Sequence, residues 1–200
     1  IPASTDGPTS KRLALDAIFA HANLPPFVSK QLIQHMVTSN PSPAYVGRVS
    51  AVFANNGSGV RGDMKSVIRA ILTDSEARSE PSGTSFGKLR EPVVRLTQWA
   101  RAFGVTSPTN LWPFGNTASN ATRLAQSPGR SPSVFNFFRP GYTPPGSAIA
   151  TQGQVAPEFQ MVNEPSVVAY INYMQSLIVN AAGAVALLAP LLLASCTGDA

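Results

Sequence analysis

The sequence predicts a mainly α fold, an irregular array of several helices with long ordered loops rich in proline, glycine and aromatic residues. Apolar residues recur at helical spacing in several segments, most clearly at Met64, Val67, Ile68, Ile71 and Leu72. The 200 residues include 18 prolines and 15 glycines, which favour ordered connections between the helices. With 44% hydrophobic residues, the chain can bury a substantial core.

Two short helices are expected first. After a polar leader, residues 11–21 are predicted to form one helix, with Ile18 and Phe19 among its apolar positions. Pro25 and Pro26 favour the start of a second helix, because proline is tolerated in the first helical turn. The apolar stripe expected on this second helix consists of Leu32, Ile33, Met36 and Val37.

Residues 42–73 are predicted to form a helical hairpin. Ser42 suits an N-cap, and Pro43 suits the first helical position. Gly57 is expected to adopt a left-handed conformation where the first helix ends. The second helix is expected to start at Asp63 or at the residue before it.

The second half alternates between helices and irregular chain. Residues 89–103 and 163–180 are predicted to be helical. Between them, residues 105–157 lose the helical pattern but carry six Phe, Tyr and Trp residues. Because disordered segments are poor in aromatic residues, we expect this stretch to be an ordered, irregular layer on the helices.

The C-terminal tail is strongly apolar. Residues 177–195 approach the length of a membrane span, so membrane association through this stretch is one interpretation. Asn180, Pro190 and the absence of flanking basic residues favour the other, a buried or partner-covered helix. Residues 181–200 are therefore set apart as an apolar tail of uncertain status.

Charge is sparse and uneven. Charged residues make up 12% of the chain, so either Ser, Thr, Asn and Gln keep it soluble, or missing chain or a partner covers part of its surface. All 15 Lys and Arg residues lie at or before Arg139, and residues 140–200 hold three acidic residues. The basic residues are scattered, with no run of three, which disfavours nucleic acid as a partner.

Several kinds of site are disfavoured by the motifs. Residues 57–62 match GxGxxG, but a helix is predicted before them where a dinucleotide site needs a strand. No GxSxG string occurs. Cys196 is the one cysteine, and His21 and His35 have no nearby metal-ligating cluster, so neither a metal nor a cofactor is expected. Catalytic residues remain unassigned, and whether the protein is an enzyme stays open.

The acidic residues form no clear acid–base pair. Asp74 and Glu76 follow a helix and are expected to be solvated. Glu91 is expected in a first helical turn, where the helix dipole favours an acid. Glu158 and Glu164 bracket a predicted helix start, and either could cap it.

One aromatic segment is the best local candidate for ligand binding. Its candidate residues are Asn136, Phe137, Phe138, Arg139 and Tyr142. An arginine beside aromatic rings can stack or hold a carboxylate, and exposed rings can bind a sugar. In the alternative interpretation, the phenylalanines are buried and pin the loop, while Arg139 bonds to loop carbonyls.

Several strings together resemble a known bacterial family, the domain of unknown function numbered 1800. They lie at residues 32–46, 56–78, 88–95, 131–142, 156–159 and 163–164. The resemblance implies that residues 1–180 are the C-terminal part of a larger helical domain, and that the protein is extracytoplasmic, in the periplasm or at the cell surface. It implies no catalytic residues. The start at Ile1 also indicates a fragment or a processed product.

These observations lead to two functional hypotheses. The first is an exported structural or interaction protein, whose partner is another protein or the missing N-terminal half. The alternative is an exported enzyme or glycan-binding protein that shares its site with that missing half.

Overall fold

The structure is a computed structural model that describes residues 6–80, 85–107, 109–112, 114–134 and 136–179. It divides into two compact units, Ile1–Lys88 and Leu89–Ala200, each with its own hydrophobic core. The described residues form helices and loops, with no strand among them. The prediction of a mainly α fold is confirmed.

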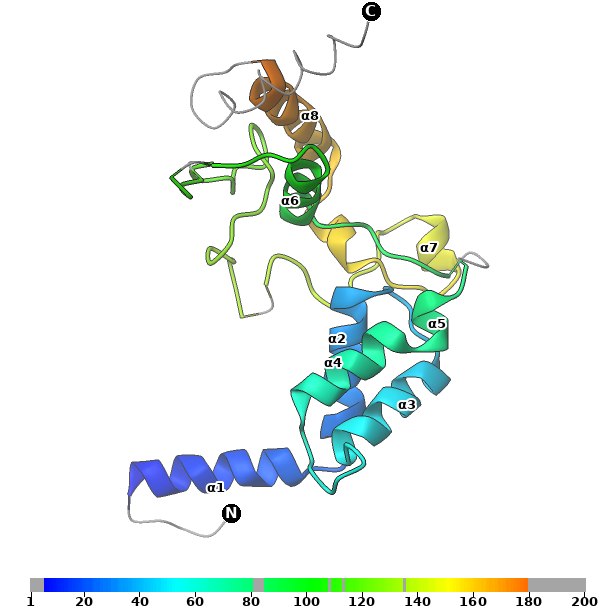
Figure 1. Ribbon diagram of the computed structural model, residues 1–200. Helices are drawn as coiled ribbons and strands as arrows, with labels where there is room; N and C mark the ends of the chain where they lie inside the picture. Colours follow the sequence, from blue (N-terminus) through cyan, green and yellow to red (C-terminus); the bar gives the residue numbers. More distant parts are fainter. Residues whose placement is uncertain (1–5, 81–84, 108, 113, 135, 180–200) are drawn as a thin grey trace, which may run out of the picture. The chain divides into compact units, whose positions relative to one another are not determined.

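The described part of the first unit contains five helices. They are α1 (Gly7–Ala20), α2 (Leu24–Met36), α3 (Pro43–Ala54), α4 (Met64–Thr73) and α5 (Ser75–Arg78). Figure 1 shows α2 beside the α3–α4 hairpin, with α1 extending away from them. No residue of α1 is buried, so this helix adds little to the core of its unit.

The core of the first unit lies between α2, α3 and α4. It consists of Ile33, Tyr45, Val49, Phe53, Val67 and Ile71. The Tyr45 hydroxyl is buried and donates a hydrogen bond to the Ile71 carbonyl at 2.7 Å. Burial raises the pKa of Tyr45 to about 12, and the nearby carboxylates of Asp74 and Glu76 act in the same direction. The phenol therefore stays protonated and keeps its donor role.

The expected ends of the α3–α4 hairpin are confirmed. Ser42 Oγ accepts from the Tyr45 amide, and Asp63 Oδ1 accepts from the amides of Lys65 and Ser66. Gly57 has a φ of +92°, as the turn chemistry predicted.

Gly62 brings the hairpin turn against α1. Its amide donates to the Phe53 carbonyl at 2.8 Å, and its φ is +74°. A Cβ at this position would lie 2.7 Å from the ring of Phe19. Only glycine therefore allows the turn and the end of α1 to approach this closely.

The second unit contains α6 (Pro92–Ala102), the short α7 (Ala148–Thr151), a 3₁₀ turn at Pro157–Gln160 and α8 (Glu164–Val179) in its described part. Leu96, Leu124 and Tyr173 form its core, with Phe114 and Met174 packed against them. Apart from α7, the described residues between 105 and 156 are irregular, as expected.

Helix α6 starts three residues later than predicted. Its first residue is Pro92, and Glu91 stands just before it. Gln126, from a distant loop, completes this end: its Oε1 accepts from the Val93 amide, and its Nε2 donates to the Glu91 carboxylate. Because Gln126 lies 33 residues after Val93, the sequence around residue 92 does not reveal this cap.

The start of α8 corrects the expectation that Glu158 and Glu164 cap a helix. Asn163 and Ser166 do so: Asn163 Oδ1 accepts from the Ser166 amide, and Ser166 Oγ accepts from the Asn163 amide. Glu164 is the exposed first residue of α8, and Glu158 lies buried in the 3₁₀ turn.

No helix within the described residues is both long and apolar enough to cross a membrane. The apolar tail at 181–200, and most of the stretch 177–195 proposed for membrane association, lie outside the described residues.

Candidate functional site

The residues of the candidate ligand segment separate by burial. Phe138 is buried, with 4% of its surface exposed. Asn136, Phe137 and Tyr142 are half-buried, and Arg139 is exposed. Phe138 thus matches the pinning role, whereas Arg139 and parts of its aromatic neighbours face solvent.

Hydrogen bonds fix the backbone of this segment. The Arg139 amide donates to Gln160 Oε1 at 2.8 Å. The Arg139 carbonyl accepts from the Tyr142 amide at 3.0 Å, and the Tyr142 carbonyl accepts from the Ala156 amide at 2.8 Å. The exposed Arg139 side chain therefore stands on a well-held loop. The groove and the pocket described below are lined by other parts of the chain.

A polar cluster in the first unit corrects the expectation that Asp74 and Glu76 are solvated. The Asp74 side chain is only 8% exposed and forms a two-pronged ion pair with Arg48, at 2.7 and 2.8 Å. Hydrogen bonding to Arg48 lowers the pKa of Asp74. Glu76 accepts from both the amide and the hydroxyl of Ser42. These carboxylates join α3 to α5, so their role is structural.

Both histidines are also part of the local structure. His21 ends α1, its Nδ1 accepts from the Asn23 amide, and its carbonyl accepts from Arg61. The His35 carbonyl accepts from Lys88 Nζ at 2.8 Å. Within the described part of the chain, no group of three or more His, Cys, Asp or Glu residues is placed to hold a metal ion.

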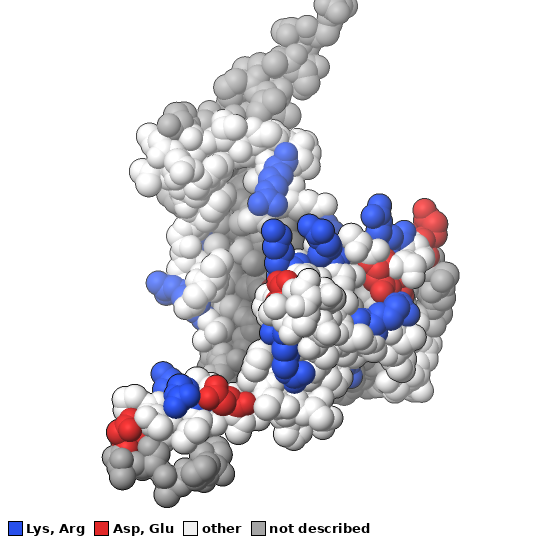
Figure 2. Space-filling model, turned by 60° about the horizontal axis from the view of Figure 1, so that its bottom comes forward, with Lys and Arg blue, Asp and Glu red and all other residues white. Residues whose placement is uncertain are grey.

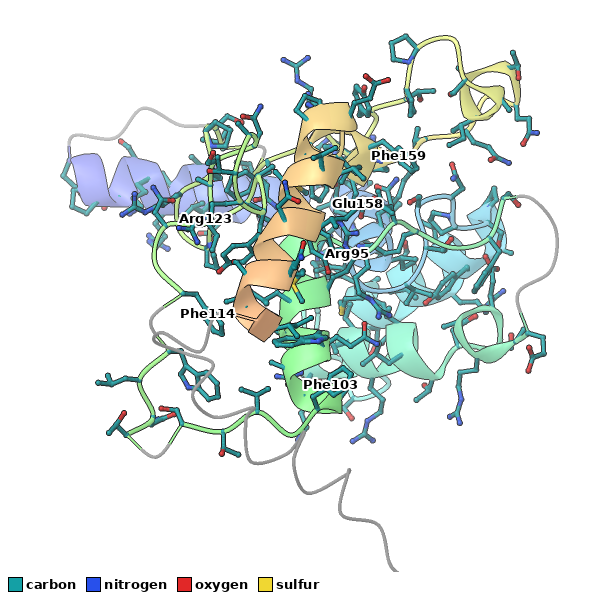
Figure 3. The ribbon with its side chains drawn as sticks, turned by 90° about the horizontal axis from the view of Figure 1, so that it is seen from above. Arg95, Phe103, Phe114, Arg123, Glu158 and Phe159 are labelled. Carbon is teal, nitrogen blue, oxygen red and sulfur yellow. The ribbon has the colours of Figure 1, made fainter. Side chains whose placement is uncertain are left out.

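Two arginines of the second unit stack on tyrosines of α8. The Arg95 guanidinium lies 4.3 Å from the centre of the Tyr170 ring, and that of Arg123 lies 5.0 Å from the centre of Tyr173. Figure 3 labels both arginines beside this helix. Burial raises the pKa of Tyr173, and the charge of Arg123 opposes that rise. These contacts fasten the loop and α6 onto α8.

An apolar groove in the first unit is the clearest candidate for a binding surface. It lies between α1 and α2 and has a volume of about 540 Å³. Its lining consists of Ala14, Ala17, Ile18, His21, Asn23, Leu24 and Phe27. Ile18 is 58% exposed and Phe27 is 63% exposed, so two large apolar side chains stand in solvent there.

Arg61 holds the wall formed by α1 in place. Its guanidinium donates to the carbonyls of Phe19 and His21, at 3.0 and 3.1 Å, and also lies over the ring of Phe19. The last carbonyls of α1 are thereby satisfied by a residue of the hairpin turn. The groove is therefore bounded by two anchored helices although α1 buries no residue.

Two lysines lie near the lining residues in the sequence. Lys11 precedes Ala14 by three residues on α1, and Lys30 follows Phe27 by three residues on α2. Within the described ranges, no acidic residue lines the groove. Elsewhere on the face shown in Figure 2, basic and acidic side chains are interspersed.

The described residues thus define a mainly helical protein with an open apolar groove and without an evident catalytic cluster. The chain matches the family described as Protein of unknown function (DUF1800) over residues 2–198. It belongs to this family, and the resemblance predicted from its sequence strings is confirmed. Neither the curated proteins nor the solved structures contain a match.

The ion pair of the polar cluster predicts a specific acid response. Because the pKa of folded Asp74 lies below its ordinary value near 3.8, the pair stabilises the fold fully above about pH 4. That contribution is lost as the pH falls from about 4 through the folded pKa. Arg48→Gln should lower stability at pH 7 and flatten the fall in stability below pH 4, as measured by urea unfolding at a series of pH values.

The matched control is Arg12→Gln, since Arg12 pairs with Asp16 at 3.7 Å on the exposed side of α1. This change should leave the acid profile nearly unaltered. An Arg48→Gln variant with the wild-type slope below pH 4 would contradict the role given to the pair.

Proposed function

We propose that this protein is an exported bacterial protein with a structural or interaction role, and that the α1–α2 groove binds an apolar helical segment of a protein partner. The observation that carries the proposal is the exposure of Ile18 and Phe27 in a groove whose walls are anchored. Covering such side chains is favourable by about 25 cal/mol per Å² of apolar surface removed from water.

The shape and charge of the groove indicate the kind of segment that fits. An open apolar surface where α1 turns into α2 can take the apolar face of an amphipathic helix. Lys11 and Lys30, each three residues beyond a lining residue, favour carboxylates on the incoming segment, since opposite charges steer association and fix its register. The proposed partner is therefore a helix with an apolar face and acidic ends, supplied by another protein or by a further region of the same polypeptide.

Site-specific crosslinking in the full-length protein tests this proposal. Phe27→p-benzoylphenylalanine places a photoreactive group in the groove, and Val94→p-benzoylphenylalanine is the control on exposed α6. Mass spectrometry should map the adducts of the first variant to an apolar helical peptide with acidic ends. Adding Lys11→Glu and Lys30→Glu should reduce that yield by about tenfold, because the groove would then repel the acids.

The control for charge reversal is Lys65→Glu on the exposed part of α4, which should leave the adduct yield unchanged. The proposal would be contradicted if the photoreactive groups at positions 27 and 94 gave the same adducts. It would also be contradicted if reversing the charges of Lys11 and Lys30 left the adduct yield unchanged.

We propose an extracytoplasmic location, in the periplasm or at the cell surface, as the resemblance of the sequence strings implies. A pair of fusions to the full-length protein tests it, because alkaline phosphatase is active only outside the cytoplasm and β-galactosidase only inside. We expect phosphatase activity and little β-galactosidase activity from fusions made at the same residue. The reverse pattern would contradict export without bearing on the groove.

Glycan binding or glycan chemistry is a second candidate. The observation that favours it is the exposed Arg139 on a fixed loop, beside the half-buried rings of Phe137 and Tyr142. The aromatic rings can contact the face of a sugar, and the guanidinium can pair with an acidic substituent on that sugar. The proposed site would be shared with the region of the larger domain that precedes this sequence.

Arg139→Ala in the full-length protein should weaken binding on a glycan array by at least about tenfold, because the charged contact is lost. Its melting temperature should remain close to wild type, since an exposed side chain is removed. The control is Arg130→Ala, which changes an exposed arginine outside the segment. If the protein turns over a sugar substrate and Arg139→Ala abolishes this turnover, the protein is an enzyme. If glycan binding is unchanged in Arg139→Ala, the segment 136–142 is not the glycan site.

A further inference from the structure

A second pocket lies in the second unit, apart from the groove and from the segment 136–142. It is formed by the C-terminal half of α6 and the loop that follows, and its volume is about 380 Å³. Its lining consists of Leu96, Thr97, Ala100, Arg101, Val105, Trp112 and Phe114. A cavity of this size is within the range of small-molecule sites.

One wall of the pocket is aromatic. The rings of Trp112 and Phe114 are stacked, with centroids 6.2 Å apart and planes inclined by 15°. Trp112 is 42% exposed, so part of its indole face is open to a ligand. Figure 3 shows Phe114 on the loop beside α6 and α8. A planar ring placed here gains stacking contacts in addition to apolar burial.

Hydrogen bonds hold this wall in place. The Trp112 indole N–H donates to Asn110 Oδ1 at 3.2 Å, and the Trp112 carbonyl accepts from the Phe114 amide at 2.8 Å. Asn110 has a φ of +54°, a strained conformation for a residue with a side chain, and its amide donates to the Ser107 carbonyl. The aromatic wall is therefore set by the loop before a ligand arrives.

Arg101 supplies the positive charge of the pocket. Among the described residues, no acidic side chain lines it, and the salt bridges found there use Arg12 and Arg48 instead. The other polar side chain, Thr97, donates its hydroxyl proton to the Val94 carbonyl at 3.0 Å, and so offers no second strong donor. The pocket thus combines an aromatic wall, apolar sides and one guanidinium.

We propose that this pocket binds a small aromatic anion. The planar ring of the ligand lies against the Trp112 indole between Leu96 and Val105, and its carboxylate or sulfonate pairs with the Arg101 guanidinium. A neutral ring of the same shape makes the apolar contacts but leaves the charge of Arg101 unmatched. The site should therefore bind an aromatic carboxylate more tightly than the neutral amide of the same ring.

Calorimetry on the protein with 1-naphthoate and with 1-naphthamide tests this. These probes share one ring system and differ in charge. We expect naphthoate to bind about tenfold more tightly than naphthamide, through the charge-assisted bond. Arg101→Gln should remove that preference while leaving weak binding of both. Equal affinities in the wild-type protein, or a preference that survives Arg101→Gln, would overturn the proposal.

Two further changes separate this pocket from other surfaces. Ala100→Leu fills part of the cavity and should weaken both probes by about tenfold, with an unchanged circular dichroism spectrum. Arg90→Gln, at an exposed arginine outside the pocket, should preserve the preference for naphthoate. Full binding by Ala100→Leu, or loss of the preference in Arg90→Gln, would place the ligand elsewhere and defeat the proposal. The outcome is independent of the groove, since Phe27→Ser should alter neither affinity.

Discussion

The buried hydroxyl of Tyr45 is the constraint on which the first unit depends. It bonds to the carbonyl of Ile71 in the middle of the apolar core, and so fixes α3 against the last turn of α4. A buried phenol without a partner would cost more than the bond contributes, so this register of the two helices is strongly favoured. The polar cluster follows directly: with α4 ending there, Asp74 reaches Arg48, and Glu76 reaches Ser42.

Local chemistry made much of the fold predictable. Ser42, Asp63 and Gly57 were recognisable because a cap or a turn depends on residues within a few positions of one another. The apolar face expected on α4 was visible only in part: Val67 and Ile71 are buried, whereas Met64, Ile68 and Leu72 are exposed. The family was recognisable for a different reason: several unusual strings occur in one chain.

What the sequence did not disclose depends on distant partners. Asp74 was expected in solvent because its partner, Arg48, lies 26 residues earlier. Gln126 caps α6 from a loop without periodicity. The groove was hidden too, because the apolar residues of α1 read alike whether or not another helix covers them.

The close approach of Gly62 and Phe19 has a mechanical consequence. Arg61 grips the end of α1 from the same turn, and Asn55 and Asn56 tie the amides of that turn to the end of α3. Helix α1, one wall of the groove, is therefore held at its C-terminal end by the α3–α4 turn. A ligand that tilts α1 must therefore disturb the contacts of this turn. A larger residue at position 62 would push against Phe19 and so shift α1, although Gly62 does not itself line the groove.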